Sequence, residues 1–176
     1  WGAIVGDAAK QRYKLLGTDI EDVKKELLEV NNLALEGKPE DMVITSHICR
    51  GNYHSTFFTS GPYDSVADYV FAKENVDALF LEYDDARSGG FAPLAKVSPE
   101  KKVVLGLITT KTPQLEEKEV VIKRIHEAAK YIPLDRLYLS PQCGFASCEI
   151  GNKLTEEEQW AKLKLVKEIA EEVWGE

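Results

Sequence analysis

The feature that most constrains the fold is a regular alternation of strand patterns with helix patterns. Short apolar runs predict four strands, at residues 42–49, 76–84, 102–110 and 135–140. Amphipathic periodicity predicts helices at residues 19–37, 63–73, 117–131 and 155–174. Thr155 and Glu158 form a capping box that opens the last of these helices. Strands that alternate with helices indicate an α/β fold with a parallel sheet.

Polar and reactive side chains gather where the predicted strands end. His47 and Cys49 end the first strand, Glu82 lies near the end of the second, residues 109–111 end the third, and Cys143 follows the fourth. The carboxyl ends of the strands carry the site both in (β/α) barrels and in open α/β sheets. An open sheet would concentrate its ligands at one switch point. Because all four consecutive strands contribute here, the pattern favours a barrel.

The length of the chain fits only part of such a barrel. Eight β/α units usually take ~250 residues, whereas this chain has 176 residues and four predicted strands. We therefore expect a single α/β unit, residues 1–176, that forms the C-terminal half of a (β/α)8 TIM barrel. Either the N-terminal half lies outside this chain or a second copy completes it. We favour the first, since the sequence opens inside an element at WGAIVGD.

Charge and cysteine content exclude several classes of function. The net charge is -8, which disfavours a nucleic-acid partner because phosphate binding needs a positive surface. No run approaches the ~20 apolar residues that span a bilayer, so we expect no membrane partner. Three cysteines without compact spacing do not form a disulfide framework. We therefore expect a reducing, cytoplasmic environment.

Four of the strand-end residues make a plausible metal site. Side chains alternate along a strand, so His47 and Cys49 point to the same side. With Glu82 and Cys143 they give one nitrogen, two sulfur and one oxygen donor, a set that suits Zn²⁺. Free cysteines are often just small buried hydrophobes. Glu82 is harder to dismiss, because it follows a buried apolar strand and needs a nearby cation, either a metal or Arg87.

Other residues near the predicted site have weaker claims. Cys148 lies five residues past Cys143, in a loop that is leaving the sheet, so Cys143 is the better ligand. His126 falls within the helix predicted at 117–131, where a solvated imidazole is the simpler interpretation. Loops at a barrel mouth are commonly just polar, but some of their residues are candidates for contact with substrate. These candidates are Asn52, His54, Asp84 and Arg87.

Three segments resemble a known enzyme family. HICRGNYHSTFF, VDALFLEYDDARSG and LYLSPQCGFAS are similar to the catalytic barrel of cobalamin-independent methionine synthase, above all to its shorter single-barrel bacterial paralogues. The resemblance covers nearly the whole chain, as the C-terminal half of the barrel. It implies transfer of a methyl group from a methylated folate to the thiol of homocysteine. By the family's pattern, the zinc ligands would be His47, Cys49, Glu82 and Cys143.

One departure from the family pattern concerns the catalytic group. The family carries a histidine in an Asp-Ile-His-Ser-Pro stretch, where this chain has Lys111 within residues 109–113. A neutral imidazole relays protons near pH 7, whereas an unperturbed lysine has a pKa of ~10.4. The catalytic residue is therefore unassigned, and Lys111 could equally pair with an anionic donor or be solvated. Alternatives remain open: another methyl donor, a corrinoid-linked methyltransferase barrel, or a metal-stapled barrel fragment without activity.

Overall fold

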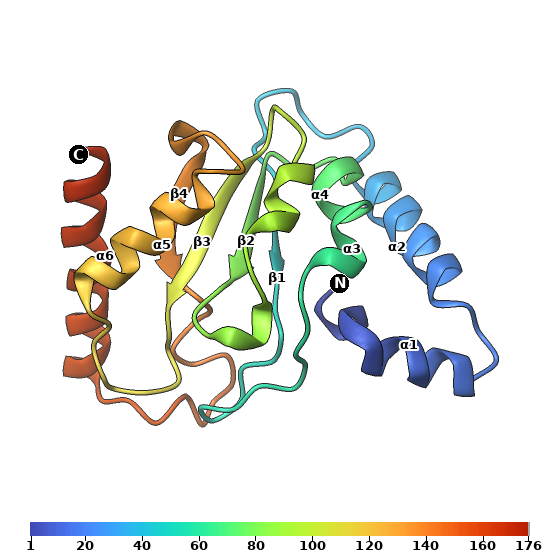
Figure 1. The fold of residues 1–176 in the computed structure, drawn as a ribbon. Coiled ribbons are helices and arrows are strands. Elements are labelled where there is room, and N and C mark those ends of the chain that lie inside the picture. Colours follow the sequence, from blue (N-terminus) through green and yellow to red (C-terminus); the bar gives the residue numbers. More distant parts are fainter. Residues whose placement is uncertain (176) are drawn as a thin grey trace.

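The centre of the protein is a parallel sheet of four strands. The structure is a computed structural model that describes residues 1–175. Its strands are β1 (Thr45–Ile48), β2 (Ala78–Glu82), β3 (Lys102–Ile108) and β4 (Leu137–Pro141). They lie in the order β1-β2-β3-β4, and each pairs in parallel with the next (Figure 1). This order has no reversal, so it matches successive units of a (β/α) barrel and confirms the predicted fold class.

Six α-helices and four short 3₁₀-helices accompany the sheet in residues 1–175. The α-helices are α1 (Gly6–Leu15), α2 (Ile20–Ala34), α3 (Asp64–Ala67), α4 (Val70–Lys73), α5 (Lys118–Ala128) and α6 (Glu156–Trp174). The 3₁₀-helices are η1 (Gly2–Ile4), η2 (Ala86–Ser88), η3 (Ala92–Lys96) and η4 (Leu134–Arg136). The predicted capping box is confirmed: the Thr155 side chain accepts from the Glu158 backbone N–H, and the Glu158 carboxylate accepts from that of Thr155. None of these helices is long and apolar enough to cross a bilayer.

The sequence pattern did not predict α1, a helix of 10 residues, and two further elements differ from the prediction. The helix expected at 63–73 is split into α3 and α4, because Tyr69 N–H bonds to the Val66 carbonyl three residues back and breaks the α-helical ladder. The first strand begins at Thr45 rather than at residue 42. Its partner β2 begins only at Ala78, so residues 42–44 extend beyond the strand that would pair with them.

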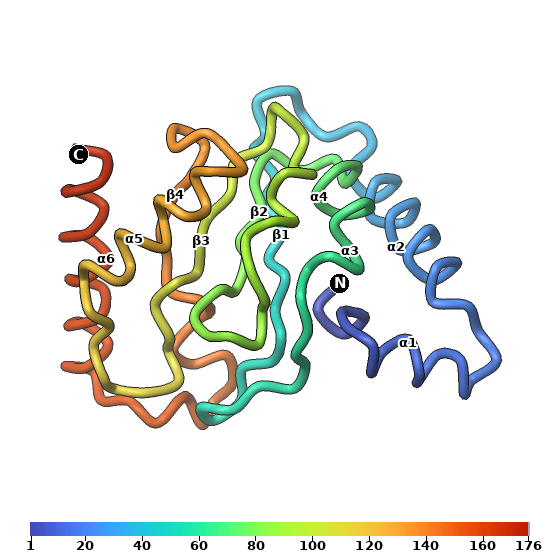
Figure 2. The backbone as a smooth tube through the Cα atoms, viewed as in Figure 1, coloured from blue at the N-terminus to red at the C-terminus, as the bar shows by residue number. Residues whose placement is uncertain are grey.

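The two faces of the sheet have different surroundings. One face carries Ile48, Leu79, Leu81 and Leu105, each at most 1% exposed, and packs against the helices. On the other face Tyr138 remains 41% exposed. A tube through the Cα atoms shows α5 and α6 on the β4 side and α1 and α2 on the β1 side (Figure 2). The exposed face corresponds to the interior of a complete barrel.

Gly106 allows a close approach between the end of β3 and the segment after β4. A Cβ atom at this position would lie 2.7 Å from Gln142 Cα and 2.9 Å from the Leu81 carbonyl oxygen. Both neighbours are backbone atoms, so the strands themselves must move to accept a methyl group. We expect Gly106→Ala to lower the free energy of unfolding by about 2 kcal/mol, as overpacking typically does. Urea denaturation measures this change.

Gly90 provides the matched control for this substitution. A Cβ atom there would meet no atom within 4 Å, so Gly90→Ala should change the free energy of unfolding by less than about 0.5 kcal/mol. Equal effects of the two substitutions would contradict the close approach at Gly106.

Candidate metal centre

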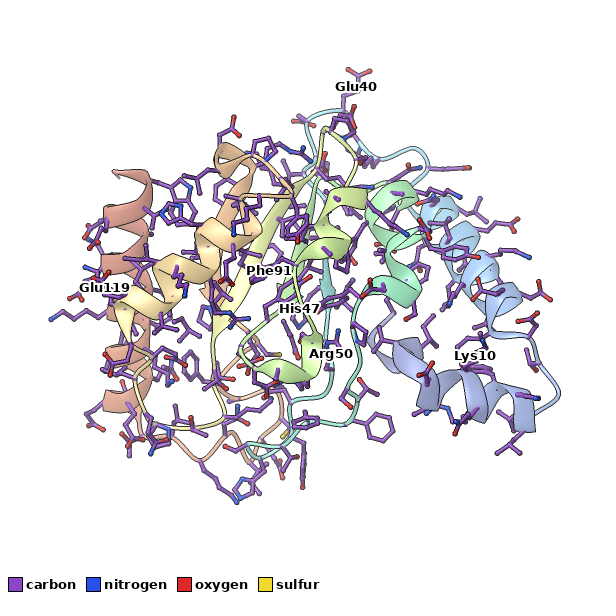
Figure 3. All side chains as sticks on the ribbon, viewed as in Figure 1. Lys10, Glu40, His47, Arg50, Phe91 and Glu119 are labelled. Carbon is purple, nitrogen blue, oxygen red and sulfur yellow. The ribbon has the colours of Figure 1, made fainter. Side chains whose placement is uncertain are left out.

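The register of the sheet brings the predicted ligands to one edge. His47 lies opposite Phe80, and Ile48 opposite Leu81, so Cys49 follows at the level of Glu82. His47, Cys49 and Glu82 therefore point to the same, inner face. In Figure 3 His47 lies near the carboxyl ends of the strands, toward the loops at the lower edge of the molecule. Cys143 comes two residues after β4 and reaches the same place from the next loop.

The four predicted ligand atoms form a compact cluster. The Sγ atoms of Cys49 and Cys143 are 4.0 Å apart, and Cys143 Sγ is 3.6 Å from His47 Nε2. His47 Nε2 is 3.8 Å from Glu82 Oε1, and all four donor atoms lie within 4.8 Å of one another. Tetrahedral zinc, with Zn–S ~2.3 Å and Zn–N ~2.0 Å, separates its ligand atoms by about 3.3–3.8 Å. The cluster therefore fits a single zinc ion.

The carboxylate of Glu82 gives an independent sign that a cation belongs here. The Glu82 side chain is completely buried, and its Oε1 atom has no hydrogen-bond partner. Its Oε2 atom accepts a hydrogen bond of 3.1 Å from the Arg87 guanidinium. A buried carboxylate oxygen without a partner is costly. The unpartnered oxygen faces His47 and the two thiols, where a metal would satisfy it.

Contacts within the cluster shift the pKa of each candidate ligand. The hydrogen bond from Cys49 lowers the pKa of Cys143 to about 3, and the same contact raises that of Cys49. The Cys143 contact also raises the pKa of His47, whereas burial raises the pKa of Glu82 despite its bond to Arg87. The two sulfurs therefore titrate as a coupled pair, in which a proton on one sulfur favours the thiolate form of the other. Coupling of this kind is usual where several anionic donors are held together.

A polar network joins the three loops around the cluster. The Asn52 side chain donates to the Gly144 carbonyl (2.7 Å) and to Ser147 Oγ (2.6 Å). Its Oδ1 atom accepts from Lys111 Nζ (2.7 Å) and from the Asn152 side chain (3.0 Å). Because these groups follow β1, β3 and β4, the network fixes the loops that carry Cys49 and Cys143.

Lys111 belongs to this network. Besides Asn52, its ammonium group donates to the Gly51 carbonyl at 3.3 Å. Burial lowers the pKa of Lys111 from its ordinary value. The ammonium group thus bonds to the loop after β1.

The remaining candidates lie at the same edge of the sheet. Asn52 is 9% exposed and its amide is occupied by protein groups. His54 Nδ1 lies 3.3 Å from the Gly151 carbonyl oxygen, and Asp84 Oδ1 lies 2.8 Å from the Arg87 guanidinium. These contacts hold loops together, and binding of substrate by Asn52, His54, Asp84 and Arg87 stays a prediction. Cys148 lies outside the four-residue cluster.

Three further residues belong to the site but were not indicated by the sequence: Gln142, Ser147 and Asn152. Thr110 was expected only as part of the polar segment 109–111 that ends the third strand. Thr110 N–H donates to the Gln142 side chain at 2.6 Å, and Asn152 donates to the Thr110 carbonyl at 2.8 Å. The Gly151-Asn152 pair is a turn signal, but no local pattern reveals that its amide reaches a residue 100 positions earlier.

A cavity of about 290 Å³ opens beside two of the candidate ligands. Its lining residues are His47, Phe80, Ser140, Pro141, Gln142, Cys143 and Gly144. Phe80 and Pro141 give it partly apolar walls. The cavity lies on the inner face of the sheet, so an entering molecule can reach His47 and Cys143 directly.

These features define an α/β half-barrel with a candidate metal centre that contains two cysteines, and comparison with known proteins gives its family. A family model described as the catalytic domain of cobalamin-independent synthase matches residues 23–172. The chain belongs to this family, cobalamin-independent methionine synthase, as its sequence motifs indicated.

Several relatives extend this result. The uncharacterized protein YxjH of Bacillus subtilis is 50% identical over 175 residues, which cover 99% of this chain and 46% of YxjH. A structure from Listeria monocytogenes, described as a vitamin-B12-independent methionine synthase, superposes with a TM-score of 0.74 at 38% identity. It is matched over 100% of this chain and 46% of its own. The chain thus spans about half the length of these two proteins.

A more distant relative carries an enzyme name. The 5-methyltetrahydropteroyltriglutamate–homocysteine methyltransferase of Bacillus licheniformis is 25% identical over 170 residues, which cover 96% of this chain and 20% of that enzyme.

Cys143 and Cys148, which lie five residues apart, give a direct test of the ligand set. Cys143→Ser replaces a thiolate within the cluster by a hydroxyl group, which is a poor zinc ligand. We expect a loss of zinc affinity greater than the ~10–100-fold caused by removing an outer-shell partner. Competition with a chromophoric chelator measures it. Cys148→Ser is the control and should bind zinc as the unmodified protein does; the opposite result would reassign the ligand to Cys148.

Proposed function

We propose that this chain supplies the zinc site of a methyltransferase that transfers a methyl group from a methylated folate to the thiol of homocysteine, giving methionine. The observation that carries the proposal is the cluster of two Sγ atoms, one Nε2 and one Oε1 within 4.8 Å. Membership of the methionine synthase family supports the choice of reaction. The name of the Bacillus licheniformis relative supports the choice of homocysteine as acceptor and of a methylated folate as donor.

The residues present suit both the ion and the substrate. Zn²⁺ held by His47, Cys49, Glu82 and Cys143 would lower the pKa of a bound thiol from its usual ~8.5, so that a thiolate is available near neutral pH. The two cysteine thiolates are strong anionic donors, which keeps an added sulfur nucleophilic. Glu82 offers a single oxygen and is the weakest donor. It is therefore the ligand that we expect a substrate thiol to replace.

The cavity beside His47 and Cys143 suits the acceptor. Its volume of about 290 Å³ accommodates a short aliphatic thiol, and the Phe80 and Pro141 side chains offer contacts for methylene groups. The ammonium and carboxylate groups of homocysteine need polar partners. Because the inner face of the sheet is open, we expect the other half of the barrel to provide these polar partners.

The position of Lys111 favours a second candidate that differs only in its donor. As the methyl group leaves a folate nitrogen, that nitrogen must gain a proton. In this structure the Lys111 ammonium group is bonded to Asn52 and Gly51. A zinc-dependent thiol methyltransferase whose donor leaves without needing a proton, such as a methylsulfonium compound, is therefore the alternative.

An assay of methyl transfer tests the proposal. Because the chain spans 46% of YxjH, it should be combined with the part of YxjH that it does not match. With zinc, homocysteine and 5-methyltetrahydropteroyltriglutamate, we expect methionine, detected by mass spectrometry, and none from the Cys143→Ser variant. Methionine formed only from a methylsulfonium donor would favour the alternative. Tight zinc binding with no product from any donor would indicate instead a barrel fragment that the metal stabilises but that has no activity.

Acid should release the metal, because protons compete for its ligands. The pKa of His47 and that of Glu82 are both raised, so these groups take up protons at a higher pH than usual. Only their deprotonated forms bind zinc. We therefore expect zinc to dissociate as the pH falls below ~6, near the ordinary histidine pKa. Metal content after dialysis at each pH measures this, and retention at pH 4 would argue against His47 as a ligand.

A further inference from the structure

The most informative unexplained contact near the site is the one between Arg87 and Glu82. Arg87 lies five residues after β2 and is not one of the four candidate ligands. Its side chain is nevertheless only 4% exposed. Its guanidinium group bonds to Glu82 Oε2 at 3.1 Å and leaves Glu82 Oε1 without a hydrogen-bond partner. One oxygen of the carboxylate is therefore fixed by the protein, and the other faces the cluster.

Several contacts hold the guanidinium group in place. Asp84 Oδ1 lies 2.8 Å from Arg87 NH2, and the Asp85 carboxylate also contacts the guanidinium. The Phe57 ring packs against it, with its centroid 4.9 Å from Cζ. The backbone is also fixed: Arg87 N–H donates to Asp85 Oδ1 at 2.8 Å, and the Arg87 carbonyl accepts from Gly61 N–H at 2.8 Å. A group bound on so many sides cannot follow Glu82 if that side chain moves.

We infer that Arg87 is a positioning residue, which restricts Glu82 to one-oxygen ligation and directs that oxygen to the metal. The inference rests on the proposed zinc site. A free carboxylate can bind a cation through both oxygens or rotate about its side-chain bonds. Here the fixed bond at Oε2 removes both options.

The simpler interpretation is that Arg87 only stabilises the η2 turn, by its ion pairs with Asp84 and Asp85. These ion pairs are sufficient for that role. The two interpretations differ in one respect: a positioning role acts through Glu82, whereas stabilising the turn does not need Glu82 at all.

Zinc affinity in a double-mutant cycle separates them. Dissociation constants for zinc would be measured by chelator competition for the unmodified chain, Arg87→Met, Glu82→Gln and the double variant. If Arg87 acts through Glu82, Arg87→Met should weaken zinc binding about tenfold, as loss of an outer-shell partner does. In the Glu82→Gln background the same change should have less than a threefold effect. Arg87→Lys keeps the charge but loses the planar fork, and should recover part of the affinity.

Arg124→Met is the matched control, because Arg124 also stacks on an aromatic ring, Phe91, at 5.4 Å, and is not among the contacts of Glu82. It should leave the zinc affinity unchanged. Thermal unfolding of the metal-free variants would show that each one folds.

Each outcome has a definite meaning. A change of less than threefold in Arg87→Met, or an equal loss in both backgrounds, would overturn the positioning role while leaving the proposed function intact. Absence of zinc binding by the unmodified chain would overturn both.

Discussion

The parallel register of β1, β2, β3 and β4 is the constraint on which the site depends. Because Ile48 pairs with Leu81 and Glu82 with Gly106, the strands end at nearly the same level. The side chains at the carboxyl ends of the strands are thus brought together by the pairing of the strands itself. Cys143 completes the group because Gly106 lets the segment after β4 approach β3 closely. A shift of one residue in β1 or β2 would turn the candidate ligands of that strand to the helix-covered face.

The sequence predicted that these four side chains lie together, as they do in the structure, and that they bind a metal stays a prediction. Alternation along a strand places His47 and Cys49 on one side, and parallel pairing places strand ends together, so residue spacing alone indicates the cluster. Glu82 was recognised because a carboxylate within an apolar strand requires a cation. The sequence left open whether that cation is a metal or Arg87. In the structure, Arg87 binds one oxygen and leaves the other facing the thiols, so the two alternatives are compatible.

The loop contacts could not be predicted in the same way. The bond between Asn52 and Asn152 joins residues 100 positions apart, and both lie in loops whose conformation no periodic pattern specifies. Asn52 was one candidate for contact with substrate, and in this structure its side chain bonds to Gly144, Ser147 and Lys111. Lys111 was compared with a histidine by position alone. Its actual surroundings depend on the path of the loop after β1.

The location of the candidate ligands separates the proposed metal site from the surfaces that would hold the substrates. All four candidate ligands lie in or just after three strands of this chain, β1, β2 and β4. A polar network within the same chain joins the loops that follow β1 and β4. The candidate metal site thus takes all four of its ligands from this half-barrel. The inner face is open: the His47 side chain is 36% exposed, and Tyr138 is 41% exposed. A substrate held near His47 would have protein on one side only. In the proposed reaction, positioning of both substrates supplies much of the rate, and we expect it to come from whatever covers this face.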